Sequence, residues 1–416
     1  MRLDPAGHAA SALATIRKVR RRGARSVAAT MGQRVHDRYR SDDLAVHLLE
    51  GDLADPGQLR LTPGVVLPEG AAATVGWVCT PAGPASGGHT TLFRMVRGVR
   101  ERGHRCVVFL YDVYGGDFDR NVARMRAGWP GLDVEYRDAT GPIDGVDACV
   151  ASSWESAQIL ALRGTSAMHR LYFVQDYEPF FFPRGSLHSL AEDTYRFGFV
   201  NVALGAAVAD MLAIQAGAAS VVVPFGCDTE AYRIDNPAQE RSGVVFFARR
   251  HVPRRGYDIG VRALAEFHRI RPDQEIQVYG DHVSDLGFPV TNHGRLSAVE
   301  LNALYNRTIG GLALSFTNVT LVGGEMLAAG NIPVANRSPY AHGGLDNDHV
   351  VWADPTPRAL GQALAEVVAH PDLQARAATA SRSVTGSWSD TQDRLVELLD
   401  GVLYGPADGT AGAAPA

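Results

Sequence analysis

From residue 74 onward, short apolar runs alternate with segments whose apolar residues recur at helical spacing. The runs at 74–79 and 105–111 predict buried strands, and the segment 89–102 between them predicts an amphipathic helix that ends at Gly103. Further strands are expected at 134–136, 147–151, 169–174, 200–204 and 220–223, with helices at 154–162 and around 187–196. Strands that alternate with helices indicate a parallel sheet covered on both faces.

The alternation stops at residues 224–242, which we interpret as a linker, and then begins again. Strands are expected at 244–247, 275–279, 311–315, 333–335 and 350–352, and helices at 257–269, 298–306, 321–329 and 357–369. The last helices, at about 372–404, are expected to cross back to the first domain. Two doubly wound α/β domains in tandem usually face each other across a cleft, and ligands bind at the carboxyl ends of their strands.

The chain length of 416 residues exceeds that of one ordinary domain, so two large domains are expected. The predicted parts are a basic N-terminal extension at 1–70, a first Rossmann-like domain at 71–235 that also receives a returning helix at about 385–404, a second Rossmann-like domain at 236–384, and a disordered tail at 405–416.

The composition is typical of a soluble globular protein, with 46% hydrophobic and 20% charged residues. The net charge of −5 gives no general attraction to nucleic acid, so no nucleic-acid partner is predicted. The four cysteines form no CxxC pair, and we interpret them as small buried side chains in a reducing compartment. No apolar run reaches eighteen residues, and the N-terminus lacks a signal peptide's apolar core. These features predict a cytoplasmic protein.

The N-terminal extension is strongly basic. Residues 1–40 hold ten arginine and lysine residues against Asp4 and Asp37, a formal charge of about +8. One interpretation is a solvated helix or a partly disordered arm. The alternative is peripheral contact with an anionic membrane, because a basic cluster is attracted to such a surface.

The segment 248–258 gives the clearest indication of a binding site. It follows the apolar run 243–247 and holds four arginines, and Gly256 precedes the next predicted helix. Guanidinium groups beside a helix N-terminus form a favourable place for an anion, and their planar donors suit phosphate oxygens. A second strand-loop-helix unit at 311–331 places Glu325 in its helix. Together the two units predict a site for a nucleoside diphosphate that carries a sugar.

Three segments resemble motifs of the retaining family 4 glycosyltransferases, which have the GT-B fold of two facing Rossmann-like domains. The loop 248–256 is similar to the family's Gly-Arg…Pro-Arg-Lys-Gly loop, the segment 294–305 to the helix before its acidic loop, and the segment 325–330 to its Glu-Ala-Met-Ala-Ala-Gly segment. The resemblance, which covers roughly residues 74–400, implies that Arg249 and Arg255 contact the donor's diphosphate and that Glu325 binds its ribose.

This sequence departs from the family pattern at Thr317, where a second glutamate often lies near the transferred sugar. Contacts to the sugar are then expected from backbone N–H groups at 320–324. The N-terminal segments 172–179, 183–186 and 191–199 resemble bacterial rhamnosyltransferases that build surface glycans, and residues 152–157 and 87–89 fit that subgroup. The resemblance implies dTDP-L-rhamnose as the donor and a glycan, lipid-linked or small-molecule acceptor.

The residues expected to act fall into three groups. The donor is expected to contact Arg249, Arg255, Tyr279, Gly280, Thr320, Leu321, Val322, Gly323 and Glu325. The acceptor side of the cleft is expected to include Gly87, Gly88, His89, Trp154, Gln175, Asp176 and Glu178. The residues expected to be catalytic are Arg249, Arg255, Asp176 and Glu178.

Each of these features also has a structural interpretation. The loop arginines could be solvated charges, and Glu325 could be an acidic residue favoured near a helix N-terminus. Gly87 and Gly88 could form a tight turn, with His89 only a polar residue of the first helical turn. At least one of the polar residues at 175–178 is expected to make structural hydrogen bonds.

Two Asp-x-Asp strings, at 117–119 and 346–348, match a metal-binding pattern that is common by chance. Because the arginines can neutralise the negative charge of the diphosphate, we predict a metal-independent enzyme without a cofactor. No nucleophile elbow, Walker loop or His-Glu-x-x-His segment is present. The resemblance to the family implies a retaining glycosyltransferase. A nucleotide-sugar epimerase of the same fold and a non-catalytic nucleotide-sugar-binding protein stay open, the latter supported by Thr317.

Overall fold

A computed structural model describes residues 47–405, apart from 85, 285, 319 and 339–344. The chain divides into two units, residues 1–51 and 52–416. The basic arm at 1–46 and the tail at 406–416 lie outside the described residues, so the expectations for them stay predictions. A short 3₁₀ helix, η2, spans Glu50–Asp52.

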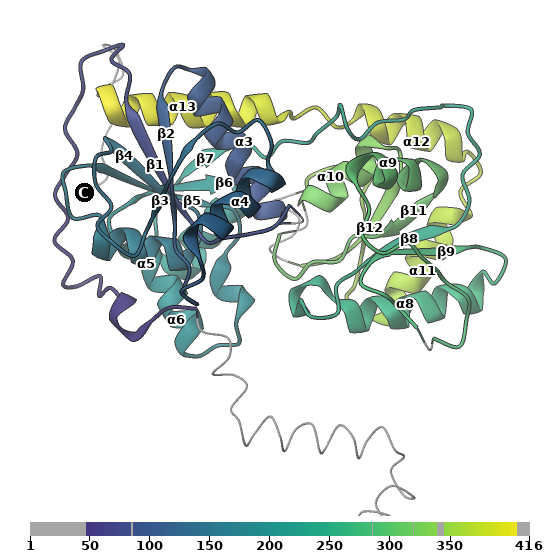
Figure 1. The fold of residues 1–416 in the computed structure, drawn as a ribbon. Helices are drawn as coiled ribbons and strands as arrows, with labels where there is room; N and C mark the ends of the chain where they lie inside the picture. Colours follow the sequence, from purple (N-terminus) through teal and green to yellow (C-terminus); the bar gives the residue numbers. More distant parts are fainter. Residues whose placement is uncertain (1–46, 85, 285, 319, 339–344, 406–416) are drawn as a thin grey trace, which may run out of the picture. The chain divides into compact units, whose positions relative to one another are not determined.

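The first domain of the larger unit contains a seven-stranded parallel sheet in the order β3-β2-β1-β4-β5-β6-β7 (Figure 1). Its strands are β1 (Thr74–Cys79), β2 (Arg105–Leu110), β3 (Glu135–Asp138), β4 (Ala148–Ala151), β5 (His169–Val174), β6 (Val200–Leu204) and β7 (Val221–Val223). Its helices are α3 (Gly87–Glu101), α4 (Phe118–Gly128), α5 (Trp154–Arg163), α6 (Ser186–Asp193) and α7 (Ala206–Met211), with the shorter turns η3 (Glu178–Phe181), η4 (Thr194–Arg196) and η5 (Leu212–Ala216).

The second domain contains a six-stranded parallel sheet in the order β10-β9-β8-β11-β12-β13. Its strands are β8 (Val244–Ala248), β9 (Ile276–Gly280), β10 (Thr291–Asn292), β11 (Gly310–Leu312), β12 (Ile332–Asn336) and β13 (Val351–Ala353). Its helices are η6 (Pro253–Arg255), α8 (Tyr257–Ile270), α9 (Ala298–Arg307), α10 (Thr320–Ala328), α11 (Pro357–Val368) and α12 (Leu373–Arg382).

The last helix, α13 (Trp388–Tyr404), returns to the first domain and lies beside α3 (Figure 1). Leu395, Leu399 and Leu403 of this helix belong to the first domain's core. The two helices approach closely at Gly98, where an added Cβ would lie 2.8 Å from the Cβ of Gln392. The predicted return of the C-terminal helix is therefore confirmed.

Hydroxyl side chains fix several helix starts, because their oxygens accept hydrogen bonds from otherwise unpaired backbone N–H groups. Ser86 caps α3, whereas Ser153, Ser297 and Ser387 form capping boxes at α5, α9 and α13. Ser86 and Ser153 stand just before helices that follow β1 and β4. These caps help to set where the polar segments at the carboxyl ends of the first sheet turn into helices.

Each sheet has its own apolar core, and both cores include residues from helices. All four cysteines are buried and free, as predicted. The strand expected at 311–315 ends at Leu312, and the backbone of Ser315 pairs with the side chain of Asn336 instead. The Ser315 N–H donates to Asn336 Oδ1, and the Ser315 carbonyl accepts from Asn336 Nδ2, both at 2.8 Å. The two-residue strand β10 and the helices α4 and α7 were not predicted.

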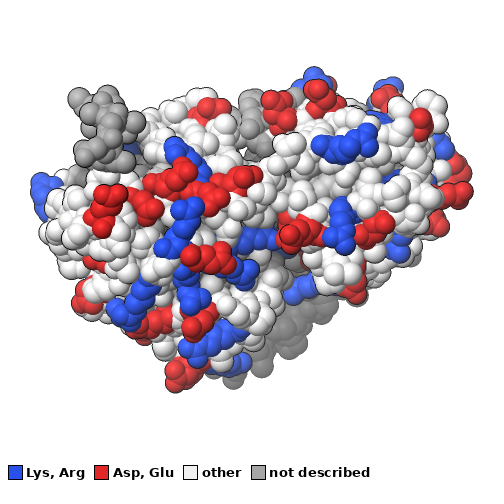
Figure 2. Space-filling model, turned by 90° about the horizontal axis from the view of Figure 1, so that it is seen from above, with Lys and Arg blue, Asp and Glu red and all other residues white. Residues whose placement is uncertain are grey.

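Arginines and acidic side chains are interspersed on the face drawn in Figure 2. That face therefore offers no continuous basic surface of the kind that nucleic-acid backbones attract. Within the described residues, no helix is long and apolar enough to cross a membrane.

Candidate active site

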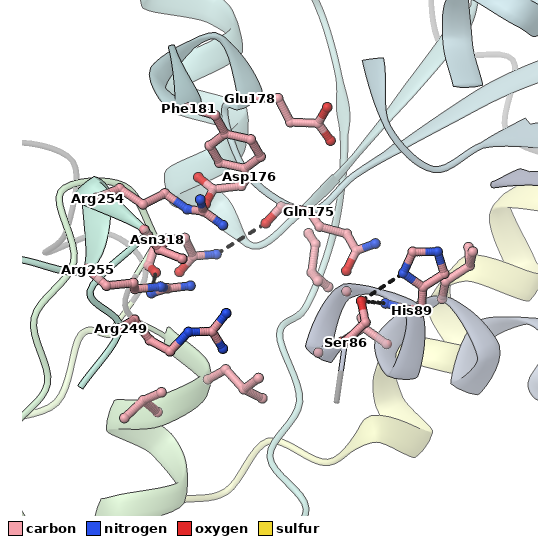
Figure 3. Close-up of a pocket in the computed structure, with 18 of the residues that line it drawn as sticks. Ser86, His89, Gln175, Asp176, Glu178, Phe181, Arg249, Arg254, Arg255 and Asn318 are labelled. Atoms are coloured by element: carbon pink, nitrogen blue, oxygen red, sulfur yellow. Dashed lines mark hydrogen bonds between the residues drawn. The ribbon is translucent and has the colours of Figure 1, made fainter. Parts of the chain in front are cut away.

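A cavity of about 530 Å³ lies where carboxyl ends of strands from both sheets meet. Residues after β5 and the first turn of α3 line it from the first domain. The loop after β8 and the start of α10 line it from the second. Figure 3 shows Arg254, Arg255 and Arg249 along one wall, with Gln175, His89 and Ser86 opposite them. This arrangement places clustered positive charge across the cavity from neutral hydrogen-bonding groups.

Most of the predicted site residues line this cavity. They are Gly87, Gly88, His89, Gln175, Asp176, Glu178, Arg249, Arg255, Tyr279, Leu321, Val322 and Glu325. The lining also includes residues that were not predicted, among them Ser86, Phe181, Arg254 and Asn318. Arg254 could have been found from its position in the arginine loop. Phe181 and Asn318 carry no such sequence signal.

Three predicted residues lie outside the lining. Trp154 is buried at the start of α5, where it supports Glu178 through its backbone. Gly280, at the end of β9, allows the close approach to β8, because an added Cβ would lie 2.5 Å from the Ala248 carbonyl oxygen. At Gly323 an added Cβ would lie 2.2 Å from Leu345 Cδ2, so this glycine lets α10 pack closely against the Leu345 side chain. The side chain of Thr320 lies outside the described part of the chain.

The arginine loop holds its three cavity-lining guanidinium groups in different environments. Arg249 leaves the end of β8, with its guanidinium 5.7 Å from the ring centre of Phe247. Arg255 Nη1 donates to Ser315 Oγ at 3.2 Å and to the Asn318 carbonyl at 2.9 Å. Burial lowers the pKa of Arg255, as does the neighbouring positive charge of Arg254. An anion in the cavity would relieve this crowding of like charges.

Gly256 makes the loop geometry possible. Its φ of 62° lies in the left-handed region, and an added Cβ would stand 3.1 Å from the ring of Phe316. The chain therefore passes from η6 into α8 at a position that strongly favours glycine. This sharp entry sets Arg254 and Arg255 against the segment 315–318, as the Phe316 N–H bond to the Arg254 carbonyl at 2.8 Å confirms.

Arg254 reaches across to an aromatic ring of the first domain. Its guanidinium carbon lies 4.0 Å from the ring centre of Phe181, and its Nε is buried without a hydrogen-bond partner among the described residues. Burial lowers the pKa of Arg254, whereas the charges of Asp176 and Glu178 raise it. The charge of Arg254 is thus attracted by the two carboxyl groups and repelled by Arg249.

Asp176 is held from both domains. Its Oδ2 accepts a hydrogen bond from Thr317 Oγ1 at 2.7 Å, and its Oδ1 accepts one from the Tyr177 N–H at 2.9 Å. Burial raises the pKa of Asp176, and the Thr317 hydrogen bond and the charges of Arg255 and Arg254 oppose that rise. A carboxylate held this way can stabilise positive charge that develops in the cavity.

Glu178 has a more structural setting. Its side chain is buried, and Oε2 accepts a hydrogen bond from the Trp154 N–H at 2.6 Å. Its own N–H donates to the hydroxyl of Tyr195 at 3.1 Å. Burial and the charge of Glu155 raise its pKa well above the usual value. The expectation that one polar residue after β5 is structural therefore fits Glu178.

His89 uses both ring nitrogens within its own loop. Nδ1 lies 2.8 Å from Ser86 Oγ, and Nε2 lies 2.8 Å from the Thr80 carbonyl oxygen. A carbonyl can only accept, so Nε2 carries the proton and Nδ1 accepts from Ser86. Burial lowers the pKa of His89, which favours the neutral ring. The histidine fixes the loop between β1 and α3 rather than offering a free base.

Glu325 stands half-buried in α10, on the cavity wall. Burial raises its pKa to about 8; the charge of Arg94 lowers it and that of Asp228 raises it. Arg94 itself is paired with Asp228 at 2.7 Å and lies over the ring of Trp388. The Glu325 carboxyl group is thus poorly solvated, and a ligand hydroxyl could supply the hydrogen bond that its ionised form needs.

The Asp-x-Asp strings do not line the cavity. Asp117 caps α4 by accepting from the Arg120 N–H at 2.7 Å, and Asn347 donates to Ser383 Oγ at 2.8 Å. In the part of the chain that the structure describes, no group of three or more His, Cys, Asp or Glu side chains could hold a metal ion.

Known proteins resemble this chain in sequence and in structure. No family model matches the chain. One curated relative, the O-antigen biosynthesis protein RfbC of Myxococcus xanthus, is 29% identical over 351 residues, which are 80% of this chain. The chain spans about a quarter of that protein's length, since the match covers 27% of it.

Solved structures resemble the chain over most of its length. A glycosyltransferase from Rickettsia africae has a TM-score of 0.57 at 13% identity, covering 80% of this chain and 99% of its own. Staphylococcus aureus TarM, in complex with fondaparinux, α-GlcNAc-glycerol and UDP, has a TM-score of 0.61 at 7% identity, covering 78% and 99%. A putative UDP-N-acetylglucosamine 2-epimerase from Listeria monocytogenes has a TM-score of 0.52 at 10% identity, covering 80% and 96%.

These likenesses show the fold. The chain has two Rossmann-like parallel-sheet domains in the GT-B arrangement, as predicted, and its neighbours include glycosyltransferases. Because the epimerase shares the architecture, the activity has to be argued from the site.

Proposed function

We propose that this protein is a glycosyltransferase that moves a sugar from a nucleoside diphosphate to an acceptor hydroxyl in glycan biosynthesis. The observation that best supports the proposal is the cavity itself. In it, Arg249, Arg254 and Arg255 of one domain face Gln175 and Asp176 of the other. The relative in O-antigen biosynthesis and the glycosyltransferase neighbours support it.

The donor would bind mainly to the second domain. Arg249 and Arg255 hold the diphosphate, and Glu325 accepts hydrogen bonds from the ribose hydroxyls. Backbone N–H groups at 320–324, at the start of α10, receive the oxygens of the transferred sugar or of the phosphate next to it. Positive charge fixed in advance at the leaving group lowers the barrier to its departure without metal assistance.

The reaction we propose retains the configuration of the sugar. The bond between the anomeric carbon and the diphosphate oxygen breaks, and the acceptor oxygen attacks from the same face. The acceptor's proton passes to the departing diphosphate oxygen, so the products are the glycoside and the nucleoside diphosphate. Asp176 stabilises the positive charge that develops on the sugar, and Glu178 supports the wall beside it.

dTDP-L-rhamnose is our first choice of donor, because the segments 172–179, 183–186 and 191–199 resemble rhamnosyltransferases. UDP-sugars have to be tested beside it, since the TarM structure contains UDP. The acceptor would enter from the first domain, past Gly87 and Gly88, which line the cavity without side chains.

The experiment that tests the proposal follows donor consumption with and without candidate acceptors, after a thermal-shift screen of nucleotide sugars. A transferase forms a glycoside and releases the nucleoside diphosphate only when an acceptor is present. Conversion of the donor sugar without an acceptor would identify an epimerase. Donor binding with no turnover across a broad acceptor set would identify a binding protein, and either result would overturn the proposal.

We predict that chelation will leave the initial transfer rate nearly unchanged. The arginines and the helix start supply the positive field that Mg²⁺ would otherwise provide. The measurement is the rate in excess EDTA, with enzyme passed through a chelating resin as a second preparation. A rate that falls in EDTA and returns with Mg²⁺ or Mn²⁺ would show that a cation takes part.

We also predict that residues 1–40 draw the protein weakly to anionic membranes when the acceptor is lipid-linked. Their formal charge of about +8 is attracted to acidic lipids, and salt screens that attraction. The measurement is co-sedimentation of the full chain and a form lacking residues 1–40 with anionic and neutral vesicles, at low and high salt. Equal sedimentation of the two forms would contradict this role.

A further inference from the structure

Three contacts join the segment 315–318 and the arginine loop to the residues after β5. Thr317 Oγ1 donates to Asp176 Oδ2 at 2.7 Å, and Asn318 Nδ2 donates to the Gln175 carbonyl at 3.3 Å. The third is the stacking of Arg254 on Phe181. All three cross from the second domain to the first. The Thr317 contact alone reaches a charged group that lines the cavity.

On the donor side, the segment that carries Thr317 is held firmly. Both backbone groups of Ser315 are bonded to the side chain of Asn336, at the end of β12. Arg255 binds the same segment at both ends, through Ser315 Oγ and the Asn318 carbonyl. The Thr317 N–H in turn donates to Ser315 Oγ at 3.3 Å. The position of Thr317 is therefore tied to Arg255 through Ser315 Oγ, which both residues contact.

Thr317 itself is suited to this link. The residue is only 4% exposed, so water cannot readily replace its hydroxyl as a donor to Asp176. The other Asp176 oxygen accepts from the Tyr177 N–H within the first domain. The carboxylate is thus oriented by one hydrogen bond from each domain, and loss of the Thr317 bond would leave it held from one side only.

We propose that Thr317 is a positioning residue that couples the diphosphate site at Arg255 to the orientation of the Asp176 carboxylate across the cavity. This inference rests on the proposed glycosyl transfer. A donor that engages Arg255 then also meets Asp176 in place, because the same short segment contacts both. The hydroxyl contributes to the rate of transfer rather than to donor affinity, since it reaches Asp176 and not the nucleotide.

The test compares Thr317→Val, which keeps the shape but removes the hydroxyl, with Thr317→Ser, which keeps the hydroxyl. Thr317→Val should lower kcat about ten- to a hundredfold, as expected for a lost hydrogen bond to a charged group, with KM for the donor nearly unchanged. Thr317→Ser should restore most of the rate. Thr379→Val, on the exposed surface of α12, controls for the change of side chain and should behave as wild type.

Two further readouts separate positioning from a merely structural role. Removing the hydroxyl removes an interaction that favours the ionised form of Asp176, so the acidic limb of the kcat/KM profile should move to higher pH in Thr317→Val. In an Asp176→Asn background, Thr317→Val should cost little more, because the partner is already gone. A wild-type kcat and an unmoved acidic limb in Thr317→Val, or fully additive losses in the double variant, would overturn the proposal.

An activity-independent measurement distinguishes failure of this inference from failure of the proposed function. The carboxyl ¹³C resonance of Asp176, identified by its loss in Asp176→Asn, should titrate at higher pH in Thr317→Val than in wild type. An unchanged midpoint overturns the link whatever the enzyme does. If wild type moves no sugar but the midpoint still shifts, the glycosyl transfer fails and the contact stands without a catalytic role. If Thr317→Val does not fold, Thr317→Ala and Thr317→Ser are compared by the same titration.

Discussion

Arg249→Ala and Arg255→Ala are each expected to weaken dTDP binding about ten- to a hundredfold. Each change removes charge-assisted hydrogen bonds to the diphosphate, worth about 1.5–3 kcal/mol. Isothermal titration calorimetry at fixed ionic strength measures the effect. Unchanged affinity in both folded variants would show that these two arginines do not bind the diphosphate.

The loop supplies a matched control in Arg250. Its side chain is exposed, donates to the Tyr257 hydroxyl at 2.7 Å and does not line the cavity. Arg250→Ala changes the net charge of the loop by the same amount as the two test variants. It should therefore leave dTDP affinity nearly unchanged, which separates direct contact from long-range attraction.

The two arginines should differ in a second respect. The Arg249 guanidinium lies over the ring of Phe247, so its loss should act mainly on affinity. Arg255 also holds Ser315 and the Asn318 carbonyl, so Arg255→Ala should lower kcat in addition to affinity. Arg255→Lys should recover part of the affinity, because it keeps the charge, but less of kcat, because a lysine ammonium lacks the planar pair of donors.

Features that depend on local sequence were predictable. Buried parallel strands are nearly continuous apolar runs, so the ranges predicted for β1, β2, β5 and β8 fall within about a residue of those observed. The arginine loop and its helix start followed from one short segment in the same way. Such features are set by residues that are neighbours in the chain.

Features that depend on distant pairing could not be predicted. Thr317 and Asp176 are 141 residues apart, and nothing in either segment indicates the other. The pairing requires the two sheets to bring their carboxyl ends together, which no local pattern describes. Arg254 was visible in its motif, but its contact with Phe181 depends on the same approach of the two domains. The environment of His89 likewise depends on the carbonyl of Thr80, nine residues earlier in a loop without regular pattern.

Glu325→Gln is expected to weaken nucleotide binding while leaving pyrophosphate binding nearly unchanged. A ribose hydroxyl donates to the ionised carboxylate more strongly than to an amide oxygen, whereas pyrophosphate has no ribose. The loss should be about tenfold or more above pH 8, measured as the ratio of the dTDP and pyrophosphate dissociation constants. Equal losses for the two ligands would show that Glu325 does not contact the ribose.

The raised pKa of Glu325, at about 8, gives this prediction a pH dependence. If dTDP binds the ionised form, a proton must leave Glu325 on binding at lower pH. Affinity should then fall by up to about tenfold per pH unit as the pH drops below 8, and should level off above it. Glu325→Gln removes the group that titrates, so its dTDP affinity should lose this dependence between pH 6 and 8.

The same pKa predicts the opposite effect on stability. The folded protein keeps the proton on Glu325 to about pH 8, whereas the unfolded chain releases it near pH 4.5. Between these values the folded state binds more protons, so the free energy of unfolding falls as pH rises, by at most about 1.4 kcal/mol per unit. Without nucleotide, Glu325→Gln should therefore melt at a higher temperature than wild type at pH 8. At pH 5 the two should be nearly equal. If Glu325→Gln binds dTDP less well but melts at a higher temperature, the Glu325 carboxylate serves ligand binding and lowers the stability of the free protein. A lower melting temperature of the variant at pH 8 would show that Glu325 stabilises the free protein instead.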